Sequence, residues 1–316
     1  MFSKISLIAV ISGLIAGIVL SGFSERVNVP KNNKPVIREI KVAAENVTLF
    51  VRIAGNTSSG NVLIGINGGP GQSSSYMHNL DRLAGDELAV VTYDQRGTGQ
   101  STEPSDGYEL TAYAADLESV RKAVGIGEAH IFGHSWGGLI AMYYAALYPQ
   151  NVRSIILMGS GPPTRKSAQA GQAELNKRIA SLQEQGLIAR TQSTNMKNLI
   201  ELILPAYFSD PKFPIPFELK NTDFNPEASQ QTVTALGDWD LSREVAGLKH
   251  PILLLWGEDD PFGLSMAEVT KNALSHAKVE LVVLKGCGHY WHECADLFFF
   301  HVRAFLNLPS KHSGRQ

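Results

Sequence analysis

The stretch that decides the fold is AHIFGHSWGGLIAMYYA, residues 129–145. An apolar run ends at Gly133-His134-Ser135-Trp136-Gly137 and passes directly into a segment of helical character. This is the pattern of the nucleophile elbow, G-x-S-x-G, in which the chain turns so sharply from strand to helix that the serine is strained. Glycines on both sides permit the close backbone approach that the turn requires. We therefore expect Ser135 to present its hydroxyl at the carboxyl edge of a sheet, as a candidate nucleophile.

Short apolar runs alternate with helical segments on both sides of the elbow. The sequence predicts strands at residues 62–66, 88–93, 152–158, 252–256 and 279–284, and helices at 110–124, from the elbow to 148, and at 291–306. Strands that alternate with helices at this spacing form right-handed crossovers. An antiparallel hairpin is expected before them, because residues 36–42 and 47–54 alternate apolar and polar side chains about Glu45-Asn46. The predicted fold class is α/β, with a mostly parallel, doubly wound sheet. Thr111 is placed to cap the first helix, and the aromatic run Phe298-Phe299-Phe300 should pack the last helix on the sheet.

The composition is that of a globular protein with a large core. The chain has 316 residues, 44% of them hydrophobic, and 28 basic against 30 acidic side chains leave a formal net charge of −2. No basic stripe suits nucleic acid, and no acidic tail indicates disorder. We therefore expect one domain with an insertion, and no nucleic-acid partner.

The first residues form a segment of a different kind. Lys4 precedes an apolar run from Ile5 to Leu20, and Val19-Leu20-Ser21-Gly22 offers small residues for a signal peptidase. An export signal at residues 1–23 is favoured over an uncleaved membrane anchor, because the run is short for a spanning helix. A buried core helix is the least favoured alternative. The polar, proline-bounded residues 24–35 are the predicted linker, and the protein is expected outside the cytoplasm, either exported or attached to the membrane by its N-terminal segment.

Two cysteines, Cys287 and Cys294, flank His289 near the end of the chain. They can pair in an oxidising compartment, but the segment between them resembles a loop that enters a helix, where the Cα separation can exceed the reach of a disulfide. We favour two small buried hydrophobic side chains. The neighbouring His292 and His301 match no Cys/His zinc spacing, so no metal site is expected.

The alternation of strands and helices stops between Gly161 and Val245. Two helical stretches, 174–184 and 197–204, precede a segment that has five prolines from Pro205 to Pro226. That segment carries five aromatic residues: Tyr207, Phe208, Phe213, Phe217 and Phe224. We interpret this region as a lid whose aromatic side chains face the site below, and a decorative insertion packed on itself is the alternative. The predicted boundaries are a core at 36–160 and 246–308, a lid at 161–245 and a flexible tail at 309–316.

A catalytic triad is predicted from three loops that each follow a predicted strand. A serine hydroxyl is a nucleophile at neutral pH only with a base in reach and a carboxylate that holds the base in the right tautomer. The three members are Ser135, His289 and an acid in the loop that follows Gly257. Each lies at the end of a predicted strand, and the carboxyl ends of parallel strands open on one crevice. The order serine, acid, histidine is the one expected of the α/β-hydrolase fold.

The choice of acid and base rests on position within these loops. Asp260 is chosen over Asp259, because the third residue after the glycine lies past the strand end, where the chain turns back. His289 lies in a short, glycine-rich loop between strand and helix, which favours a functional role. His134, beside the nucleophile, is interpreted as packing, and His292 lies a turn into the last helix.

The oxyanion hole is predicted from two backbone N–H groups. One belongs to Trp136, the residue after the nucleophile, and the other to Gly69 in the glycine-rich loop 67–71. Each such donor is worth on the order of 10²–10³ in rate. In the expected cycle His289 takes the proton of Ser135, an acyl-enzyme forms and water hydrolyses it, so no metal or organic cofactor is needed.

Four motifs together resemble one branch of the α/β-hydrolases. They are Gly68-Gly69-Pro70-Gly71, Asp94-Gln95-Arg96-Gly97-Thr98-Gly99-Gln100-Ser101, Gly133-His134-Ser135-Trp136-Gly137-Gly138 and Gly288-His289-Tyr290. The set is similar to that of the prolyl iminopeptidases, including the tricorn-interacting-factor aminopeptidases, over nearly all of residues 36–307 outside the lid. The resemblance implies a serine peptidase that removes an N-terminal residue, often proline, beneath a helical cap that restricts entry to short peptides. It also supports Asp260 as the acid, and we expect Asp94 and Arg96 to brace loops by hydrogen bonds.

The sequence departs from that family at two points. Asn67 stands where the family usually has His before the GGPG motif, a change that leaves the Gly69 N–H in place. In the family, acidic residues of the cap grip the free amine of the substrate, and no such motif can be matched here. Glu201, Glu218 and Glu227 are candidates by composition only, and each is more often a solvated charge. The substrate-binding residues therefore remain unassigned.

Three functional hypotheses stay open. The first is an exported aminopeptidase acting on short peptides, the second is a carboxylesterase or lactonase with the same triad, and the third is a binding protein on an inactive hydrolase scaffold. A dehalogenase or epoxide hydrolase with an Asp nucleophile is excluded by Ser135 at the elbow. The sequence does not indicate an oligomeric state.

Overall fold

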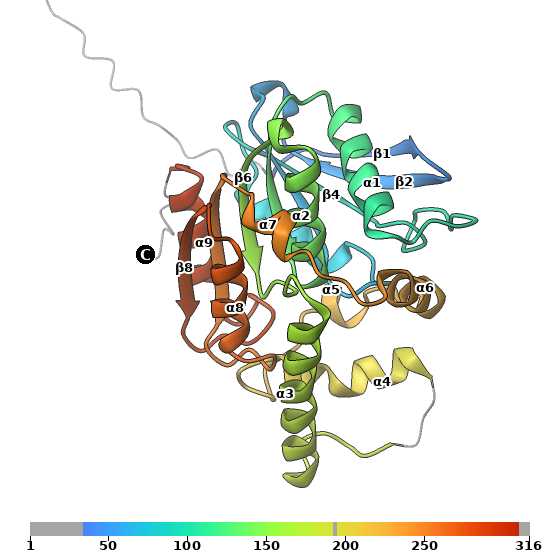
Figure 1. Cartoon of the computed structure of the whole chain (residues 1–316), viewed down its shortest axis with the longest axis vertical. Coiled ribbons are helices and arrows are strands. Elements are labelled where there is room, and N and C mark those ends of the chain that lie inside the picture. The colour runs from blue at the N-terminus through green and yellow to red at the C-terminus, as the bar shows by residue number, and fades with distance from the viewer. Residues whose placement is uncertain (1–33, 192–194, 310–316) are drawn as a thin grey trace, which may run out of the picture. The chain divides into compact units, whose positions relative to one another are not determined.

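The structure, a computed structural model, describes residues 34–191 and 195–309 (Figure 1). The predicted export segment, nearly all of the predicted linker and the predicted tail from residue 310 on lie outside the described residues. The described residues from Pro35 on form one compact unit. Within the described ranges, no helix combines the length and the apolar character needed to cross a bilayer.

The described chain is built on an eight-stranded sheet with the strand order β1-β2-β4-β3-β5-β6-β7-β8. The strands are β1 (Ile37–Ala44), β2 (Val47–Ala54), β3 (Val62–Ile66), β4 (Ala89–Tyr93), β5 (Ala129–His134), β6 (Val152–Met158), β7 (Pro251–Gly257) and β8 (Lys278–Leu284). The hairpin β1–β2 and the pair β2–β4 are antiparallel, and the other neighbours are parallel. The α/β class and the mostly parallel sheet are confirmed, and each predicted strand overlaps an observed one.

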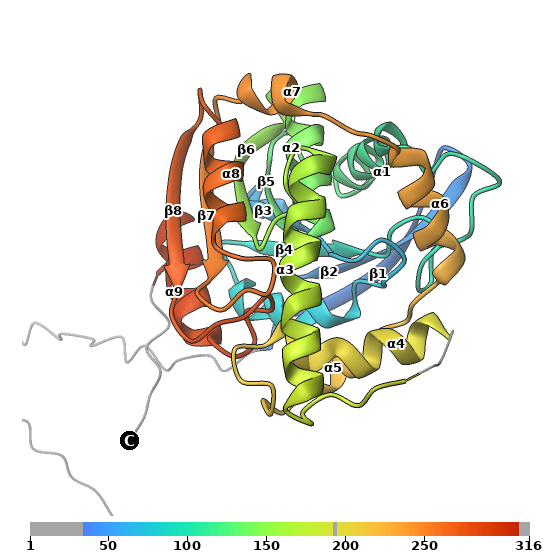
Figure 2. The same cartoon turned by 60° about the horizontal axis from the view of Figure 1, so that its bottom comes forward.

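Helices cover both faces of the sheet (Figures 1 and 2). One core cluster joins the sheet to α1 (Leu110–Ala123), α2 (Trp136–Leu147) and α8 (Ser265–Ala273). A second joins the opposite face to the 3₁₀ helix η2 (Ser75–Leu83) and to α9 (Ala295–Phe305). Because both faces are buried, the central strands carry continuous apolar runs instead of alternating ones.

Two local expectations at helix ends are wrong, and the expectation for the aromatic run of the last helix holds for two of its three residues. Thr111 does not cap α1: the N-cap is Glu109, and its side chain makes no capping hydrogen bond. The last helix begins at Ala295 and not at Trp291. Within α9 the aromatic run divides, because successive helical residues point about 100° apart: Phe298 and Phe299 are buried, whereas Phe300 is 64% exposed.

The region between β6 and β7 holds helices and, among its described residues, no strand of the sheet. The helices are α3 (Arg165–Glu184), α4 (Met196–Ile203), α5 (Phe217–Lys220), α6 (Pro226–Leu236) and α7 (Ser242–Ala246). Figure 1 shows α3, α4 and α5 beyond the carboxyl ends of the parallel strands. This region corresponds to the predicted lid, and α3 begins nine residues before the helix expected from 174 to 184.

The aromatic side chains of the lid differ in where they point. The rings of Tyr207 and His289 lie 5.7 Å apart, and Phe208 is buried and stacks on Tyr290 at 5.8 Å. Phe217 is 76% exposed, so the expectation that the aromatic set faces the site is wrong for this residue. It sits in the first position of the short helix α5, whose inward side is occupied by the buried Leu219.

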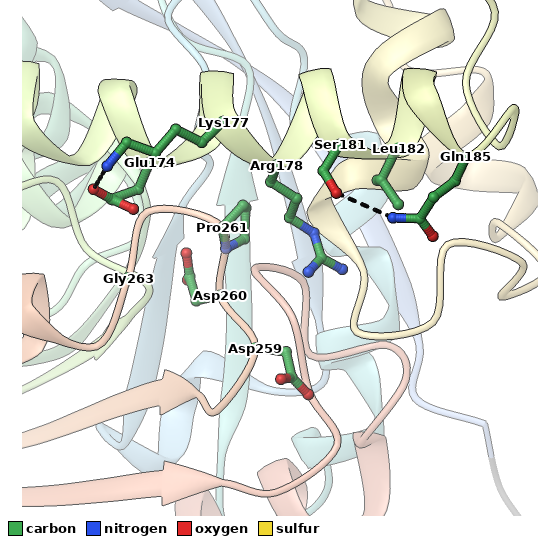
Figure 3. Close-up of a pocket in the computed structure, with 10 residues that line it drawn as sticks. All are labelled: Glu174, Lys177, Arg178, Ser181, Leu182, Gln185, Asp259, Asp260, Pro261 and Gly263. Carbon is green, nitrogen blue, oxygen red and sulfur yellow. Dashed lines mark hydrogen bonds and ion pairs between the residues drawn. The ribbon is translucent and has the colours of Figure 1, made fainter.

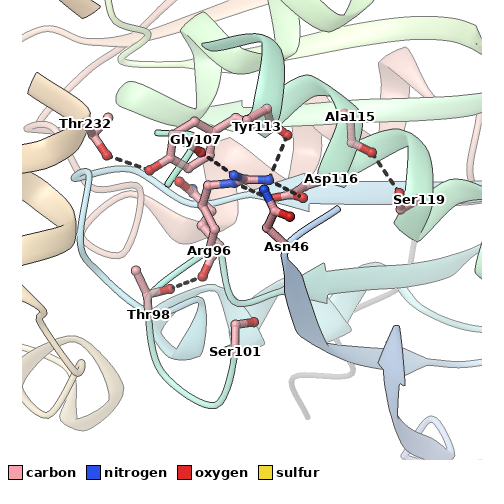
Figure 4. A network of polar contacts seen from close by, with 12 residues as sticks. Asn46, Arg96, Thr98, Ser101, Gly107, Tyr113, Ala115, Asp116, Ser119 and Thr232 are labelled. Atoms are coloured by element: carbon pink, nitrogen blue, oxygen red, sulfur yellow. Dashed lines mark hydrogen bonds and ion pairs between the residues drawn. The ribbon is translucent and has the colours of Figure 1, made fainter. Parts of the chain in front are cut away.

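The loop after β4 is braced as expected. Asp94 accepts hydrogen bonds from the backbone and hydroxyl of Ser74 and from the N–H of Gln100, each at 2.8 Å. Arg96 forms two 2.8 Å hydrogen bonds with Asp116 on α1, and both side chains are almost fully buried (Figure 4). This pair ties the loop to the helix over the sheet.

Removing one partner of this buried pair should destabilise the fold strongly. Asp116→Ala leaves the Arg96 guanidinium buried without its carboxylate, and the free energy of unfolding is expected to fall by about 3–5 kcal/mol. Urea denaturation measures the loss. The matched change Glu128→Ala, which removes the carboxylate of an exposed pair with Arg153 at 3.8 Å, should cost less than about 1 kcal/mol. Equal losses of stability in the two variants would contradict the view that the buried pair of Arg96 and Asp116 stabilises the fold more than an exposed pair does.

Candidate active site

The elbow has the strained geometry that its glycines predict. Ser135 lies between β5 and α2 with φ 53° and ψ −121°, a region that residues with a side chain rarely occupy. A Cβ at Gly133 would lie 2.5 Å from the carbonyl oxygen of Gly137, and a Cβ at Gly137 would collide with the backbone of Ile66. The elbow therefore requires glycine at these positions and holds Ser135 at the carboxyl edge of the sheet.

His289 and Asp260 are in direct contact. Nδ1 of His289 lies 2.8 Å from Oδ2 of Asp260, and both side chains are buried. The other carboxylate oxygen accepts a hydrogen bond from the N–H of Phe262 at 2.9 Å. An ionised carboxylate only accepts, so Nδ1 carries the proton in the neutral ring and Nε2 is left as an acceptor.

The neighbouring carboxylate has a different environment. Asp259 is exposed, and its Oδ2 accepts a hydrogen bond from the hydroxyl of Ser209 at 2.5 Å. Figure 3 shows Asp259 and Asp260 on the loop that faces α3. Both residues line a pocket of about 450 Å³. The structure thus places Asp260, and not Asp259, against the histidine.

Ser135 and His289 line one pocket of about 160 Å³. The structure thereby brings together residues that follow β5, β7 and β8, as their positions at the strand ends predict. Gly159, directly after β6, was not singled out from the sequence. A Cβ there would lie 2.9 Å from Nδ1 of His289 and 3.1 Å from Oδ2 of Asp260, so a side chain at this position would crowd the pair.

The loops with the two predicted oxyanion donors are joined by one side chain. Nε2 of Gln95 donates to the carbonyl oxygen of Asn67 at 2.8 Å and to its side-chain oxygen at 3.0 Å, and Oε1 of Gln95 accepts from the indole of Trp136 at 2.9 Å. Asn67 also donates to the carbonyl oxygen of Gln72 at 2.8 Å, which shows how the loop is braced. The N–H of Trp136 opens α2, where the helix supplies no acceptor. The oxyanion role of Gly69 and Trp136 stays a prediction.

His134 is buried among aromatic rings, as interpreted from the sequence, and it also forms hydrogen bonds that the sequence does not indicate. The N–H of Gly68 donates to the hydroxyl of Tyr76 at 2.6 Å, that hydroxyl lies 2.7 Å from Nδ1 of His134, and Nε2 of His134 lies 3.1 Å from the carbonyl oxygen of His289. Burial holds the pKa of His134 well below its ordinary value. In the neutral ring the tyrosine therefore donates to Nδ1, and Nε2–H donates to the carbonyl. The chain of bonds links the glycine-rich loop to the loop of the candidate base.

Buried histidines make stability depend on pH. Burial lowers the pKa of His130 to about 4 and that of His292 to about 4. The folded protein keeps these rings neutral, whereas the unfolded chain takes up protons below about pH 6.5. Stability is therefore full above pH 6.5 and is lost as the pH falls toward 4.

Urea denaturation at pH 7.5 and pH 5 should show this loss. Each of the two rings contributes on the order of 2 kcal/mol to the difference. His130→Gln should reduce the difference in unfolding free energy between the two pH values by the contribution of one ring, about 2 kcal/mol. His276→Gln, at an exposed position, should leave this difference unchanged. An unfolding free energy that stays flat over this range would refute the assignment.

Cys287 and Cys294 form a disulfide, so the preference for two unpaired cysteines is wrong. Their Cα atoms are 5.5 Å apart, within the range that a disulfide spans. The physical reason is that the helix begins only at Ala295, so the residues between the cysteines turn back on themselves instead of extending along a helix. Among the described residues, no group of three or more His, Cys, Asp or Glu side chains is arranged to hold a metal ion.

Comparison with known proteins agrees with this geometry. A family model described as the alpha/beta hydrolase fold matches residues 61–294, well over half of the sequence. The chain belongs to the α/β-hydrolase family. Proline iminopeptidase of Lactobacillus delbrueckii subsp. bulgaricus is 32% identical to this α/β-hydrolase in an alignment 269 residues long. The match covers 77% of this chain and 88% of that protein.

Solved structures of α/β-hydrolases superpose on the described fold. Proline iminopeptidase of Mycobacterium smegmatis gives a TM-score of 0.63 at 21% identity, covering 85% of this chain and 98% of that one. An esterase from Exiguobacterium antarcticum gives 0.69 at 20% identity, covering 85% and 100%. At these identities the likeness shows the fold alone. The resemblance to the prolyl iminopeptidases is confirmed by sequence, and this α/β-hydrolase is a serine hydrolase, as expected.

Proposed function

We propose that this α/β-hydrolase is an aminopeptidase that releases N-terminal residues, including proline, from short peptides through an acyl-enzyme on Ser135. The observation that carries the proposal is the shared pocket of Ser135 and His289, with Asp260 hydrogen-bonded to the far side of the imidazole. The similarity to proline iminopeptidases favours peptides over other acyl compounds.

The proposed cycle follows from the tautomer of His289. Nε2 takes the proton of Ser135 as the hydroxyl oxygen attacks the carbonyl carbon of the first residue. Asp260 stabilises the imidazolium, and the N–H groups of Trp136 and Gly69 are assigned to the oxyanion. The imidazolium then protonates the departing amine of the shortened peptide. Water, deprotonated by the same nitrogen, attacks the acyl-enzyme. The bond to the serine oxygen breaks, the imidazolium returns the proton to that oxygen, and the free amino acid leaves.

The pocket beside Ser135 suits a small first residue. Its apolar walls come from Trp256, Phe262 and Met266, and its volume is about 160 Å³. A Cβ at Gly171 of α3 would contact the side chains of Phe262 and Met266 at 3.4 Å. Helix α3 of the lid therefore packs on the side chains that line this pocket. The small volume and apolar walls fit a compact apolar ring or side chain.

Glu201, one of the three glutamates considered for the substrate amine, lies near the glycine-rich loop. It lines a small pocket with Gln72 and Phe224. A Cβ at Gly69 would lie 2.5 Å from the amide oxygen of Gln72, so this pocket adjoins the predicted oxyanion loop. We assign Glu201 as the candidate partner of the free amine.

A substrate panel tests the proposal. Proline-, alanine- and leucine-anilides are assayed beside p-nitrophenyl esters, with labelling by a fluorophosphonate probe as a substrate-independent measure of the activated serine. We expect labelling and turnover of the anilides, with the proline compound preferred. Turnover of esters alone would replace the aminopeptidase by the esterase or lactonase alternative. Absence of labelling would favour a binding protein on an inactive scaffold.

We also propose that the protein works outside the cytoplasm. The apolar run from Ile5 to Leu20 supports export, and the disulfide between Cys287 and Cys294 is suited to an oxidising compartment. Mass spectrometry of the N-terminus of the protein isolated from fractionated cells would distinguish a cleaved signal from a retained anchor. A full-length chain in the soluble cytoplasmic fraction would contradict both.

A further inference from the structure

The lid backbone lies directly against the loop that carries the candidate base. The N–H of His289 donates to the carbonyl oxygen of Tyr207 at 2.7 Å. A Cβ at Gly288 would lie 2.7 Å from Cα of Phe208, closer than real contacts allow. Glycine at position 288 therefore permits residues 206–210 of the lid, here called the docking segment, to touch the base loop.

One carboxylate of the core joins the docking segment to this loop. Oε2 of Glu293 accepts hydrogen bonds from the N–H of Ser209 at 2.7 Å and from the N–H of Gly288 at 2.9 Å. Oε1 accepts from the N–H of Asp210 at 2.9 Å. Three backbone donors, two from the lid and one from the residue before His289, thus converge on a single side chain. Hydrogen bonds to an ionised acceptor are stronger than bonds between neutral groups.

A cation of the lid holds three carbonyl groups of the docking segment. The guanidinium of Arg178 on α3 donates to the carbonyl oxygens of Ala206 at 2.9 Å, Phe208 at 2.6 Å and Ser209 at 3.1 Å. Figure 3 shows Arg178 extending from α3 toward the loop of Asp259 and Asp260. The docking segment is therefore fixed from two sides, with three of its carbonyl groups on the cation and two of its N–H groups on Glu293.

We propose that Glu293 is a positioning residue for the base, which fixes the backbone of His289 by locking the loop to the lid. The hydrogen bonds of its carboxylate go to backbone N–H groups and not to Ser135, Asp260 or the imidazole. Glu293 therefore acts through the peptide N–H of Gly288 and through the docking segment. The inference rests on the proposed role of His289. Displacement of a catalytic group by about 1 Å can cost about 10²-fold in rate, so loosening this loop should lower activity without removing any catalytic group.

Glu293→Gln is the sharpest test. Glutamine has one acceptor oxygen, so its NH₂ group must face at least one of the three N–H donors. We expect the rate of fluorophosphonate labelling of Ser135, and kcat with a cleavable substrate, to fall about 10–100-fold. KM should change less than about threefold, since the substrate pocket is untouched. Asp296→Asn, at an exposed residue on α9, is the matched control and should label like the wild type.

The outcomes of this experiment separate the positioning role of Glu293 from a folding defect and from failure of the proposed function. Labelling rates are compared per folded molecule, with the folded fraction taken from circular dichroism at the assay temperature. Glu293→Asp, which keeps the charge on a shorter arm, should give an intermediate loss and serves where the glutamine variant does not fold. Wild-type labelling rates in the folded variants would overturn the positioning role. An unlabelled wild type would instead overturn the proposed function, because the probe reacts with an activated serine whatever the natural substrate.

Discussion

Ser135→Ala is expected to lower kcat by on the order of 10⁶-fold, because no acyl-enzyme can form without the hydroxyl. Alanine keeps the Cβ, so the backbone strain at φ 53° is unchanged and the fold should be retained. The loss should be equal for anilides and esters, since both would pass through the same nucleophile. Steady-state kinetics and fluorophosphonate labelling measure it.

The control for this prediction is Ser265→Ala. Ser265 opens α8, is exposed and lies outside the pocket that Ser135 lines. The activity and labelling of the Ser265→Ala variant should match those of the wild type. Labelling that persists in Ser135→Ala and disappears in another serine variant would place the nucleophile elsewhere and would remove the basis of the proposed cycle.

The parts of the site that the sequence predicts are those fixed by local rules. Gly133 and Gly137 around Ser135 specify a turn that few other residues could make, and the structure has that turn. The positions of Asp260 and His289 directly after apolar runs predict their convergence, because parallel strands end at one edge of a sheet. The comparison with proline iminopeptidases then supplies the family, which local rules alone do not.

The parts that the sequence does not predict depend on contacts between distant segments. Gln95 bridges Asn67 and Trp136, and Glu293 holds lid residues more than eighty positions earlier in the chain. Gln95 and Trp136 lie in recognisable motifs, but the motifs do not say which side chains meet, and Glu293 belongs to none of them. The beginning of α3 is a further example: residues 165–173 have no clear apolar face, and the helix there packs through the buried Gly171 on Met266 and Phe262. Tertiary packing thus decides where such a helix begins.

Asp260→Asn is expected to lower kcat by about 10³–10⁴-fold while leaving KM nearly unchanged. The amide has the size of the carboxylate, but its NH₂ group can donate to Nδ1 of His289. That bond stabilises the tautomer with the proton on Nε2, which is then unable to accept the proton of Ser135. The lost charge also removes the partner of the imidazolium that forms during attack.

Asp259→Asn separates this effect from a general loss of charge in the loop. The two carboxylates are adjacent in sequence, but Asp259 is exposed and contacts the hydroxyl of Ser209, whereas Asp260 is buried against the imidazole. The Asp259 variant should therefore keep kcat within about fivefold, in line with the small energies of exposed polar contacts. If both variants lost activity equally, the loop would act through its net charge. If only Asp259→Asn lost activity, the catalytic acid would be Asp259 and not Asp260. The expected pattern, a large loss in one variant and a small loss in its neighbour, follows only if a single buried carboxylate orients the base.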